Sequence, residues 1–246
     1  MKEEKLLYEG KGKKIFQISH SKDQVLLFFK DDLTAYQAKK KGAFENKGEI
    51  CRKISSLIFK YLEKNGIETH WIEDVSSRQM RCFKTEMIPL EVVIRNRLAG
   101  STAKRLGLKE GQRIEEALLE FYYKRDDLDD PFVSEEQIKQ LGLIKNKSLI
   151  KDIKEKSFLI NKHLQVFFKR ANLELVDFKM EFGLFKNKIL LADEMSPDSC
   201  RIWEEKTGER LDKDRFRRNW GQVKESYQKI ECLLFKTWKE LSDFKK

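Results

Sequence analysis

The segment Asp177-Phe-Lys-Met-Glu-Phe-Gly183 alternates between charged and apolar residues, and this pattern constrains the fold more than any other in the sequence. Because alternate residues of a β-strand face opposite sides, three charged residues would share one face: Asp177, Lys179 and Glu181. The other face would carry only apolar side chains and pack on a core. The charged face is either a polar site or a solvated sheet surface that holds an ion pair.

The next apolar run, Ile189-Leu-Leu-Ala192, leads directly into Asp193-Glu194. A three-residue loop at 186–188 would place Glu181 opposite Asp193, whereas a two-residue turn would pair Glu181 with Ala192 and direct Asp193 to the apolar side. Burying a carboxylate there is costly, so we expect the three-residue register or a bulge that restores it. Two adjacent carboxylates repel unless a cation lies between them, and Mg²⁺ with ATP phosphates is the usual cation.

The first third of the chain is rich in strand-like apolar runs, and helical spacing becomes common later. Apolar residues at helical spacing predict helices over 49–63, 149–171 and 222–241. We also predict a strand over 67–72. The composition shifts near Pro89, which indicates an α+β protein with a β-rich N-terminal lobe over 1–86 and a mixed C-terminal lobe over 87–246.

The composition excludes several classes of protein. Of 246 residues, 40% are hydrophobic and 37% charged, which is typical of a globular chain. The net charge of +10 suits nucleic acid, an acidic membrane or small polyanionic substrates, and equally a solvated lysine-rich surface. No apolar run reaches the roughly 18 residues that span a bilayer, and the charged start lacks a signal-peptide core. Four cysteines without a CxxC pair indicate reduced thiols in a cytoplasm.

Three further segments carry groups that can bind anions. Gly10-Lys-Gly-Lys-Lys14 lies between two strand-like segments, and it is either a hairpin over ATP phosphates or an ordinary hairpin with solvated lysines. Arg95-Asn-Arg97 precedes Gly100-Ser-Thr102, where arginines could grip a phosphate beside a helix start. The alternative is that these arginines form structural ion pairs. The basic run at 213–218 is typical of a solvated helix start and less often of a phosphate contact.

Six segments occur in this order along nearly the whole chain: LLYEGKGKKIF, IPLEVVIRNRLAGS, EFYYKRDDLDDP, LVDFKMEFG, LADEMSPDSCRIW and LDKDRFRRN. Together, and in this order, they resemble the phosphoribosylaminoimidazole-succinocarboxamide synthase (SAICAR synthetase) family. The resemblance implies a two-lobed, ATP-grasp-like and kinase-related fold with ATP between the lobes. It implies a cytoplasmic ligase of purine synthesis that joins carboxyaminoimidazole ribonucleotide (CAIR) to L-aspartate with ATP and Mg²⁺. Relatives are often homodimers, and neither nucleic acid nor a membrane is expected as a partner.

The resemblance assigns residues to ATP and its metal. The residues expected at the ATP phosphates are Lys11, Gly12 and Lys13. Met87 would belong to the segment against the adenine, and Lys124 would lie near the ribose and phosphates. The residues expected to hold Mg²⁺ are Glu181 and Asp193.

The resemblance also assigns residues to CAIR. The residues expected on its phosphate side are Arg95, Ser101 and Arg201. Asp177 and Lys179 would lie near its reacting end as the catalytic pair, and Asp130 at the mouth of the substrate site. ATP would activate the CAIR carboxylate as an acyl phosphate, which the aspartate amine then attacks.

One region departs from the family's pattern. After Asp31-Asp-Leu-Thr-Ala35 the family carries Asn or Asp two residues on, where this chain has Tyr36-Gln37-Ala38. The family's later Asn-Asn pair is replaced by Cys51-Arg52. If this region is a loop that orders over the substrates, the replacements would change the lid and the aspartate pocket.

Two other classes of function can be compared with the ligase. A kinase-like phosphotransferase could use the same hairpin and acidic pair, but the sequence has no HRD-type catalytic loop. A basic nucleic-acid-binding module would need an aromatic strand, zinc finger or helix-turn-helix that the sequence lacks. A cleft with basic walls and acidic pairs at its floor would favour ATP chemistry, and an open basic stripe would favour nucleic acid.

Overall fold

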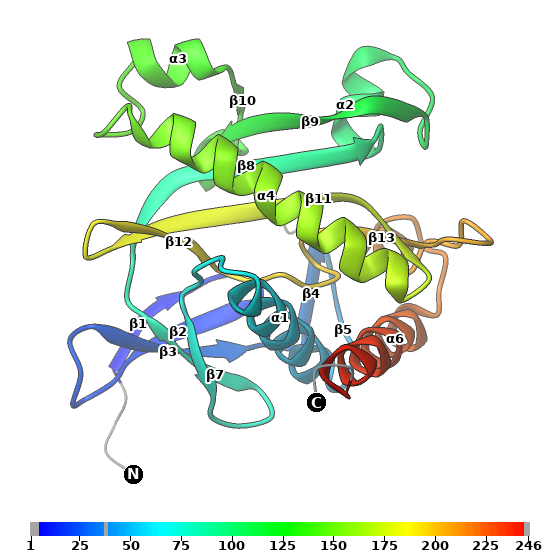
Figure 1. Ribbon diagram of the computed structural model, residues 1–246, viewed down its shortest axis with the longest axis horizontal. Coiled ribbons are helices and arrows are strands. Elements are labelled where there is room, and N and C mark those ends of the chain that lie inside the picture. Colours follow the sequence, from blue (N-terminus) through cyan, green and yellow to red (C-terminus); the bar gives the residue numbers. More distant parts are fainter. Residues whose placement is uncertain (1–4, 37–38, 244–246) are drawn as a thin grey trace.

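The N-terminal part of the chain forms a five-stranded antiparallel sheet in the computed structural model, which describes residues 5–36 and 39–243 (Figure 1). Its strand order is β1-β2-β3-β7-β6. The strands are β1 (Lys5–Glu9), β2 (Lys13–Gln17), β3 (Gln24–Phe29), β7 (Gln79–Phe83) and β6 (Trp71–Asp74). The predicted strand over 67–72 therefore begins later, at Trp71, because Thr69 instead forms a parallel bridge to Leu191 in the second sheet.

The second sheet contains the segment 177–183, in which charged and apolar residues alternate. Its order is β10-β9-β8-β11-β12, and β13 pairs with the first half of β11. The strands are β8 (Glu86–Arg97), β9 (Arg113–Tyr123), β10 (Phe132–Val133), β11 (Leu173–Phe185), β12 (Lys188–Ala192) and β13 (Cys200–Glu204). A separate hairpin is formed by β4 (Asp32–Ala35) and β5 (Lys40–Ala43).

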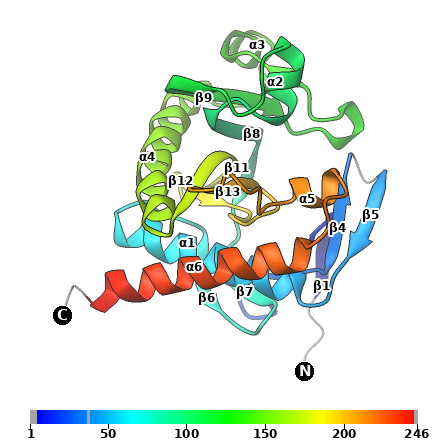
Figure 2. The same cartoon turned by 90° about the vertical axis from the view of Figure 1, so that its right-hand side faces the viewer.

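Two long helices cover the sheets and a third crosses beside them. Helix α1 (Lys47–Lys64) packs on β3, β6 and β7, and α4 (Leu149–Arg170) packs on β8 and β11. Helix α6 (Val223–Asp243) packs against both helices, as Figure 2 shows from the side. The short helices are α2 (Gly100–Leu106), the 3₁₀ turn η1 (Asp126–Leu128), α3 (Glu135–Gln140) and α5 (Asp214–Arg217). The α+β class and the three long helices are confirmed.

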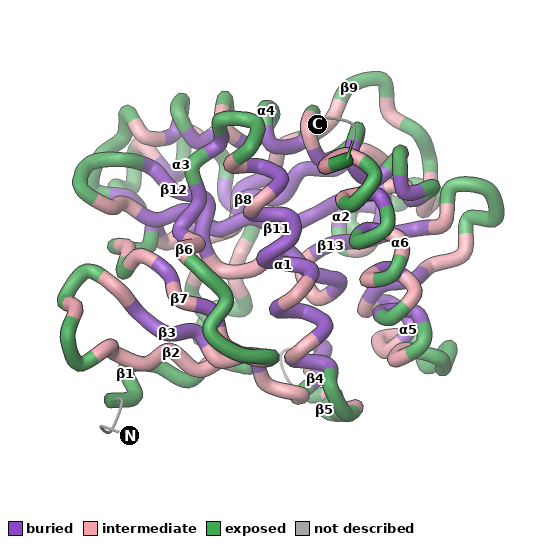
Figure 3. The backbone as a smooth tube through the Cα atoms, turned by 60° about the horizontal axis from the view of Figure 1, so that its bottom comes forward, coloured by how far each residue is buried: buried purple, intermediate pink, exposed green. Residues whose placement is uncertain are grey.

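The apolar face of β11 lies in the core, as the alternation predicted. Phe178, Met180 and Phe182 are at most 1% exposed. They belong to one hydrophobic cluster that runs through both sheets and α1, and the buried tube segments in Figure 3 follow it. Because this core is continuous, the division of the chain at residue 86 stays a prediction.

The predicted register of the β11–β12 hairpin is wrong. Phe185 pairs with Lys188, and Glu181 pairs with Ala192, so the turn has only two residues, Lys186 and Asn187. Both have positive φ, 48° and 66°, which matches the right-handed twist of a tight hairpin. Asp193 avoids the apolar side because it lies beyond the end of β12, and its φ of 64° turns the chain out of the strand's alternation.

The sequence indicates reduced thiols, and it contains no apolar run long enough to span a bilayer. All four cysteines fall within the described residues, and each is a free thiol. None of the helices between residues 5 and 243 that the structure describes is long and apolar enough to cross a membrane.

Candidate active site

The two sheets meet at Lys13, the first residue of β2. Its ammonium bonds to the carboxylate of Asp193 and lies 2.8 Å from Oε1 of Glu194. Burial lowers the pKa of Lys13, but the two carboxylates outweigh it and raise the pKa above its usual range. The turn after β12 therefore presents two carboxylates to the glycine–lysine hairpin.

A second group of lysines surrounds Glu181 on the polar face of β11. Lys179 Nζ lies 2.8 Å from Oε1 of Glu181 and 2.7 Å from Oε1 of Glu91, and Lys124 bonds to Oε2 of Glu181. Glu181 is only 3% exposed. Burial would raise its pKa, yet the two ammonium groups lower it to about 2. The carboxylate is therefore held ionised by neighbouring cations.

Arginines dominate the other end of the same strand face. Asp177 accepts from Arg95 Nη1 at 2.8 Å and from Arg201 Nη1 at 2.8 and 3.0 Å. Arg201 Nε donates to Asp214 at 2.9 Å. Arg95 Nη2 points to the hydroxyls of Ser101, at 3.3 Å, and Tyr122, at 3.2 Å. For the arginines of 95–97, the structure shows the alternative of structural ion pairs, since Arg95 binds Asp177 and Arg97 binds Glu174, and a phosphate contact stays a prediction.

Gly100, the first residue of α2, brings Arg201 to the start of that helix. Its φ is 59°, a conformation that favours glycine, and a Cβ built there would lie 2.3 Å from Nη2 of Arg201. Since Nε and Nη1 are bonded to Asp214 and Asp177, the Nη2 group lies against the α2 backbone beside Ser101. This corner offers guanidinium, hydroxyl and backbone N–H donors to one anion.

A cavity of about 380 Å³ joins these clusters. Six of the predicted site residues line it: Lys11, Arg95, Ser101, Asp177, Lys179 and Arg201. Further lining residues come from β4, β8, β9, the turn between β12 and β13 and the segment around α5, and include Thr34, Glu91, Tyr122, Asp198, Lys213 and Arg217. Basic and acidic groups therefore surround one cleft, which is the arrangement that favours ATP chemistry over an open nucleic-acid stripe.

The remaining predicted residues lie around this cavity rather than on its wall. Lys13, Lys124, Glu181 and Asp193 form the lysine–carboxylate contacts described above. Gly12 is in the β1–β2 turn, where a Cβ would lie 3.7 Å from Nζ of Lys47.

Met87 and Asp130 lie outside the lining residues as well. Met87 is 39% exposed on β8, opposite Gly183 of β11. Asp130 accepts a hydrogen bond from the backbone N–H of Arg125 at 2.8 Å, and so closes the loop after β9. In the same loop Asp126 binds Lys11 of the glycine–lysine hairpin at 2.7 Å.

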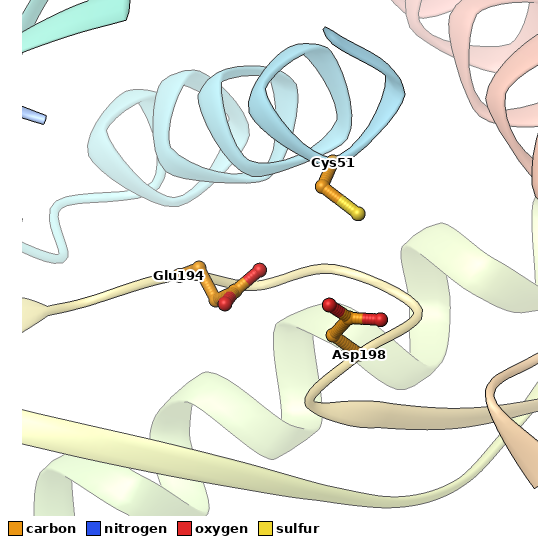
Figure 4. Close-up of side chains that lie close together, drawn as sticks. All are labelled: Cys51, Glu194 and Asp198. Atoms are coloured by element: carbon orange, nitrogen blue, oxygen red, sulfur yellow. The ribbon is translucent and has the colours of Figure 1, made fainter. Parts of the chain in front are cut away.

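Lys47 is a buried residue of the site that the sequence did not reveal. Its side chain is 2% exposed and bonds to Asp198, whose Oδ1 accepts from Tyr227 Oη at 2.8 Å. Burial lowers the Lys47 pKa, but the carboxylates of Asp198 and Glu194 outweigh this effect and raise the pKa above its usual range; the Cys51 thiol lies beside them. Figure 4 shows those three side chains converging; their ligand atoms lie within 4.8 Å of one another, and the Lys47 ammonium supplies the positive charge among them.

The basic run at 213–218 is not a solvated helix start. Asp214 is 2% exposed, and Lys213 lies beside Asp198, with its pKa lowered by burial. Lys213 and Arg217 line the cavity. The sequence signal for the buried position of this run is Asp214, the acidic residue between its basic residues. Asp214 binds both Arg201 and Arg217.

The departure at Cys51-Arg52 lies inside α1 and not in a loop over the substrates. Cys51 is fully buried, and burial raises the pKa of its thiol. Arg52 Nε donates to Ser77 O at 3.0 Å, and Nη1 lies 3.1 Å from Asp74. These contacts tie α1 to the β6–β7 hairpin. Gln37 and Ala38, the other departure, lie outside the described residues.

The chain is similar to known proteins of one family. The sequence model of SAICAR synthetase matches residues 6–232. A phosphoribosylaminoimidazole-succinocarboxamide synthase of Clostridium botulinum is 46% identical over 94% of this chain and 97% of its own. The crystal structure of that enzyme from Ehrlichia chaffeensis is 41% identical, with a TM-score of 0.89 over 94% of this chain and 98% of its own. A SAICAR synthetase solved with ADP is 43% identical, with a TM-score of 0.88 over 92% of this chain and 96% of its own. The expected ATP-grasp-like fold is thereby confirmed, and the chain belongs to the SAICAR synthetase family.

Proposed function

We propose that this chain is an ATP-dependent carbon–nitrogen ligase that condenses CAIR with L-aspartate to give SAICAR, ADP and phosphate in de novo purine synthesis. One observation carries the proposal: the Lys179–Glu91 pair and the Arg201–Asp177 pair line one cavity, which Lys11 of the glycine–lysine hairpin lines as well. The lysines suit a nucleoside triphosphate and the arginine suits a phosphorylated substrate. The family relationship supports this, as does the 43% identical relative solved with ADP.

The donor set fits a divalent cation of the Mg²⁺ type. The available atoms are carboxylate oxygens, which Mg²⁺ prefers, and each carboxylate is now neutralised by a lysine. Glu181 and Asp193 would hold the ion, and Glu194 adds a further oxygen beside Asp193. When bound, Mg²⁺ supplies positive charge to the ATP phosphates.

The lysines of the glycine–lysine hairpin would hold the triphosphate. Lys13 lies at the junction of the sheets, and Lys11 lines the cavity from the same hairpin. Both ammonium groups are bonded to carboxylates, so each can exchange a carboxylate oxygen for a phosphate oxygen without losing an anionic partner. Lys124 and Lys179 would remain near Glu181 and face the transferring phosphoryl group.

The arginine cluster would hold CAIR by its phosphate. Nη2 of Arg201 lies at Gly100, the start of α2, and the neighbouring Ser101 accepts from Arg95 Nη2, which supports this corner as the phosphate side. Asp177 and Lys179 follow along the β11 face toward the triphosphate end. CAIR bound in this direction would present its carboxylate to the lysine cluster.

The proposed reaction has two steps. A carboxylate oxygen of CAIR attacks the γ-phosphorus of ATP, the bond to the β-phosphate oxygen breaks, and ADP leaves. The neutral amine of aspartate then attacks the acyl carbon, inorganic phosphate leaves, and the amine loses a proton as the amide forms. Lysine ammonium groups stabilise the charge that develops on the transferring phosphoryl group in the first step.

The deciding experiment is ADP release by the purified protein with ATP, Mg²⁺ and CAIR, with and without L-aspartate. Aspartate-dependent release with one new amide per ADP would support the ligase. Release without aspartate and without amide would instead indicate a phosphotransferase or an ATPase. Omitting CAIR is the control, because ATP and aspartate alone contain no carboxylated imidazole to activate.

The oligomeric state and the cellular location are also part of the proposal and have their own tests. The family relationship supports a homodimer in a cytoplasm. Light scattering on the purified chain measures the mass in solution, and a mass near 29.3 kDa would contradict the dimer. Fractionation of the source cells tests the location.

A further inference from the structure

Glu120 of β9 collects four hydrogen-bond donors from around the arginine cluster, although it does not line the cavity. Arg95 Nε donates to Oε2 at 2.6 Å, and Arg105 Nη2 donates to Oε1 at 2.6 Å. Thr102 Oγ1 donates at 2.8 Å and Tyr122 Oη at 3.0 Å. The residue is 7% exposed. Such a set of donors gives the carboxylate one orientation.

The contacts of Glu120 determine how Arg95 faces the cavity. With Nε fixed by Glu120 and Nη1 by Asp177, the guanidinium plane is set on two edges. Nη2 is then directed to the hydroxyls of Ser101 and Tyr122. Tyr122 donates its own proton to Glu120, so it offers a lone pair to Arg95. Glu120 thereby orders Arg95, Ser101 and Tyr122, which line the cavity at the proposed phosphate side.

We propose that Glu120 is a positioning residue for the nucleotide substrate, which sets the affinity of the cavity for CAIR through Arg95 and Tyr122 without touching the ligand. This inference rests on the proposed function, because it places the CAIR phosphate beside Ser101 and Arg201. Nothing in these contacts extends to the lysine cluster. The effect of Glu120 is therefore confined to the nucleotide substrate and leaves ATP binding unchanged.

A simple counter-charge would behave in the opposite way. If Glu120 only neutralised Arg95 and Arg105, its removal would leave excess positive charge and strengthen the binding of an anion. If Glu120 holds the guanidinium in place, its removal weakens that binding. The pKa of Glu120 supports an ionised group in either case, because Arg95 lowers it against the effect of burial. The sign of the change in affinity separates the two roles.

The test is Glu120→Gln, with KM measured separately for CAIR and for ATP. Glutamine keeps one acceptor oxygen but sets an NH₂ group against guanidinium donors, so one arginine loses its partner. We expect KM for CAIR to rise about 10- to 100-fold, the range for loss of a hydrogen bond to a charged group, with a smaller fall in kcat and no change in KM for ATP. Glu120→Asp keeps the charge and should recover part of the loss.

The matched control is Glu174→Gln. Glu174 accepts from Arg97 Nε at 2.6 Å, which is the same contact at the same distance, but neither residue lines the substrate cavity. Both KM values should stay at the wild-type level in this variant. Thermal unfolding of all variants shows whether a loss of stability accompanies the kinetic change.

Several outcomes would overturn the proposal. A lower KM for CAIR in Glu120→Gln would indicate a counter-charge, and equal changes in both KM values would indicate a structural role. If the glutamine variant does not fold, Glu120→Asp replaces it; because this variant keeps the charge but shortens the side chain by one methylene, a raised KM for CAIR alone would support positioning, and an unchanged KM would indicate a counter-charge. Should wild-type protein release no aspartate-dependent ADP, calorimetric titration with CAIR still measures the Glu120 effect, so the two failures are distinguishable.

Discussion

The lysine end and the arginine end of the β11 face bind carboxylates in different ways. At the lysine end, the side chains of Lys13, Lys179 and Lys124 are 13%, 29% and 38% exposed, and each is a single ammonium on a flexible stem. At the arginine end, the side chains of Arg95 and Arg201 are 3% and 16% exposed, and each uses several N–H groups in a planar fork. The two ends adjoin one strand, β11, yet the cationic side chains at the lysine end have more conformational freedom than those at the arginine end.

The difference indicates which end rearranges during turnover. A lysine can exchange one anionic partner for another because its ammonium has no preferred plane. In the proposed reaction, carboxylates at that end would pass from lysine to Mg²⁺ when ATP binds. An arginine held on two edges keeps its geometry and can recognise one substrate repeatedly. We expect substitutions at the lysine end to change kcat and those at the arginine end to change KM for CAIR.

The largest effect is expected from Glu181→Gln and Asp193→Asn. Each removes one carboxylate charge proposed to hold the metal, and we expect turnover to fall at least about 1,000-fold. Folding should be affected little in Asp193→Asn, because asparagine tolerates the left-handed conformation found at this position. ADP release and urea unfolding measure the two quantities. Near-normal rates in both variants would contradict the proposal that Glu181 and Asp193 hold the metal. They would also contradict the expectation that substitutions at the lysine end change kcat.

A smaller effect is expected from Gly100→Ala at the arginine end. The added methyl group would lie 2.3 Å from Nη2 of Arg201, so the guanidinium must move. We expect KM for CAIR to rise about tenfold, roughly the loss of one hydrogen bond to a charged group, with KM for ATP unchanged.

The control for this substitution is Gly107→Ala at the other end of α2. Gly107 has a φ of 65°, close to the 59° of Gly100, and a Cβ there meets no atom within 4 Å. The two variants share the cost of placing alanine at positive φ, and only Gly100→Ala displaces Arg201. Equal KM values for CAIR in the two variants would argue against a phosphate site at this corner.

The smallest effect on activity, but a clear effect on acid stability, is expected from His70→Gln behind the lysine end. His70 is buried, its Nε2 lies 3.6 Å from Cys82 Sγ, and burial lowers its pKa to about 4. Between the ordinary value near 6.5 and 4, the unfolded chain binds a proton that the folded chain does not. The free energy of unfolding therefore falls as pH drops through this window, by about 3 kcal/mol at most.

Urea unfolding at several pH values between 7 and 4 tests this prediction. His70→Gln should flatten the pH dependence, whatever its stability at pH 7. His20→Gln, a substitution on the exposed turn before β3, should keep the wild-type slope. Identical slopes in the two variants would show that His70 does not contribute to the acid sensitivity.

Part of the molecule could be predicted from the sequence because it depends on local patterns. The alternation in β11 placed Asp177, Lys179 and Glu181 on one face, and periodicity located the long helices. The family resemblance then selected six residues that do line the cavity. Their roles toward ATP, CAIR and Mg²⁺ stay proposals.

The rest could not be predicted because it depends on contacts between distant segments. Glu120 has no local signature, since its donors come from β8, α2 and β9 itself. Lys47 cannot be distinguished from a surface lysine in the sequence, because its partner Asp198 is 151 positions away. The β11–β12 register depended on whether Lys186 and Asn187 could both adopt positive φ, which the apolar pattern of the strands does not reveal.

The left-handed conformation of Asp193 has a consequence for engineering. Grafting the acidic pair onto another two-stranded scaffold by copying only side-chain identities would place this carboxylate on the wrong face. The transplant must include the residue's backbone conformation, together with the tight hairpin that sets its distance from Glu181. The unit to be moved is therefore a hairpin with its exit turn, and not two amino acids.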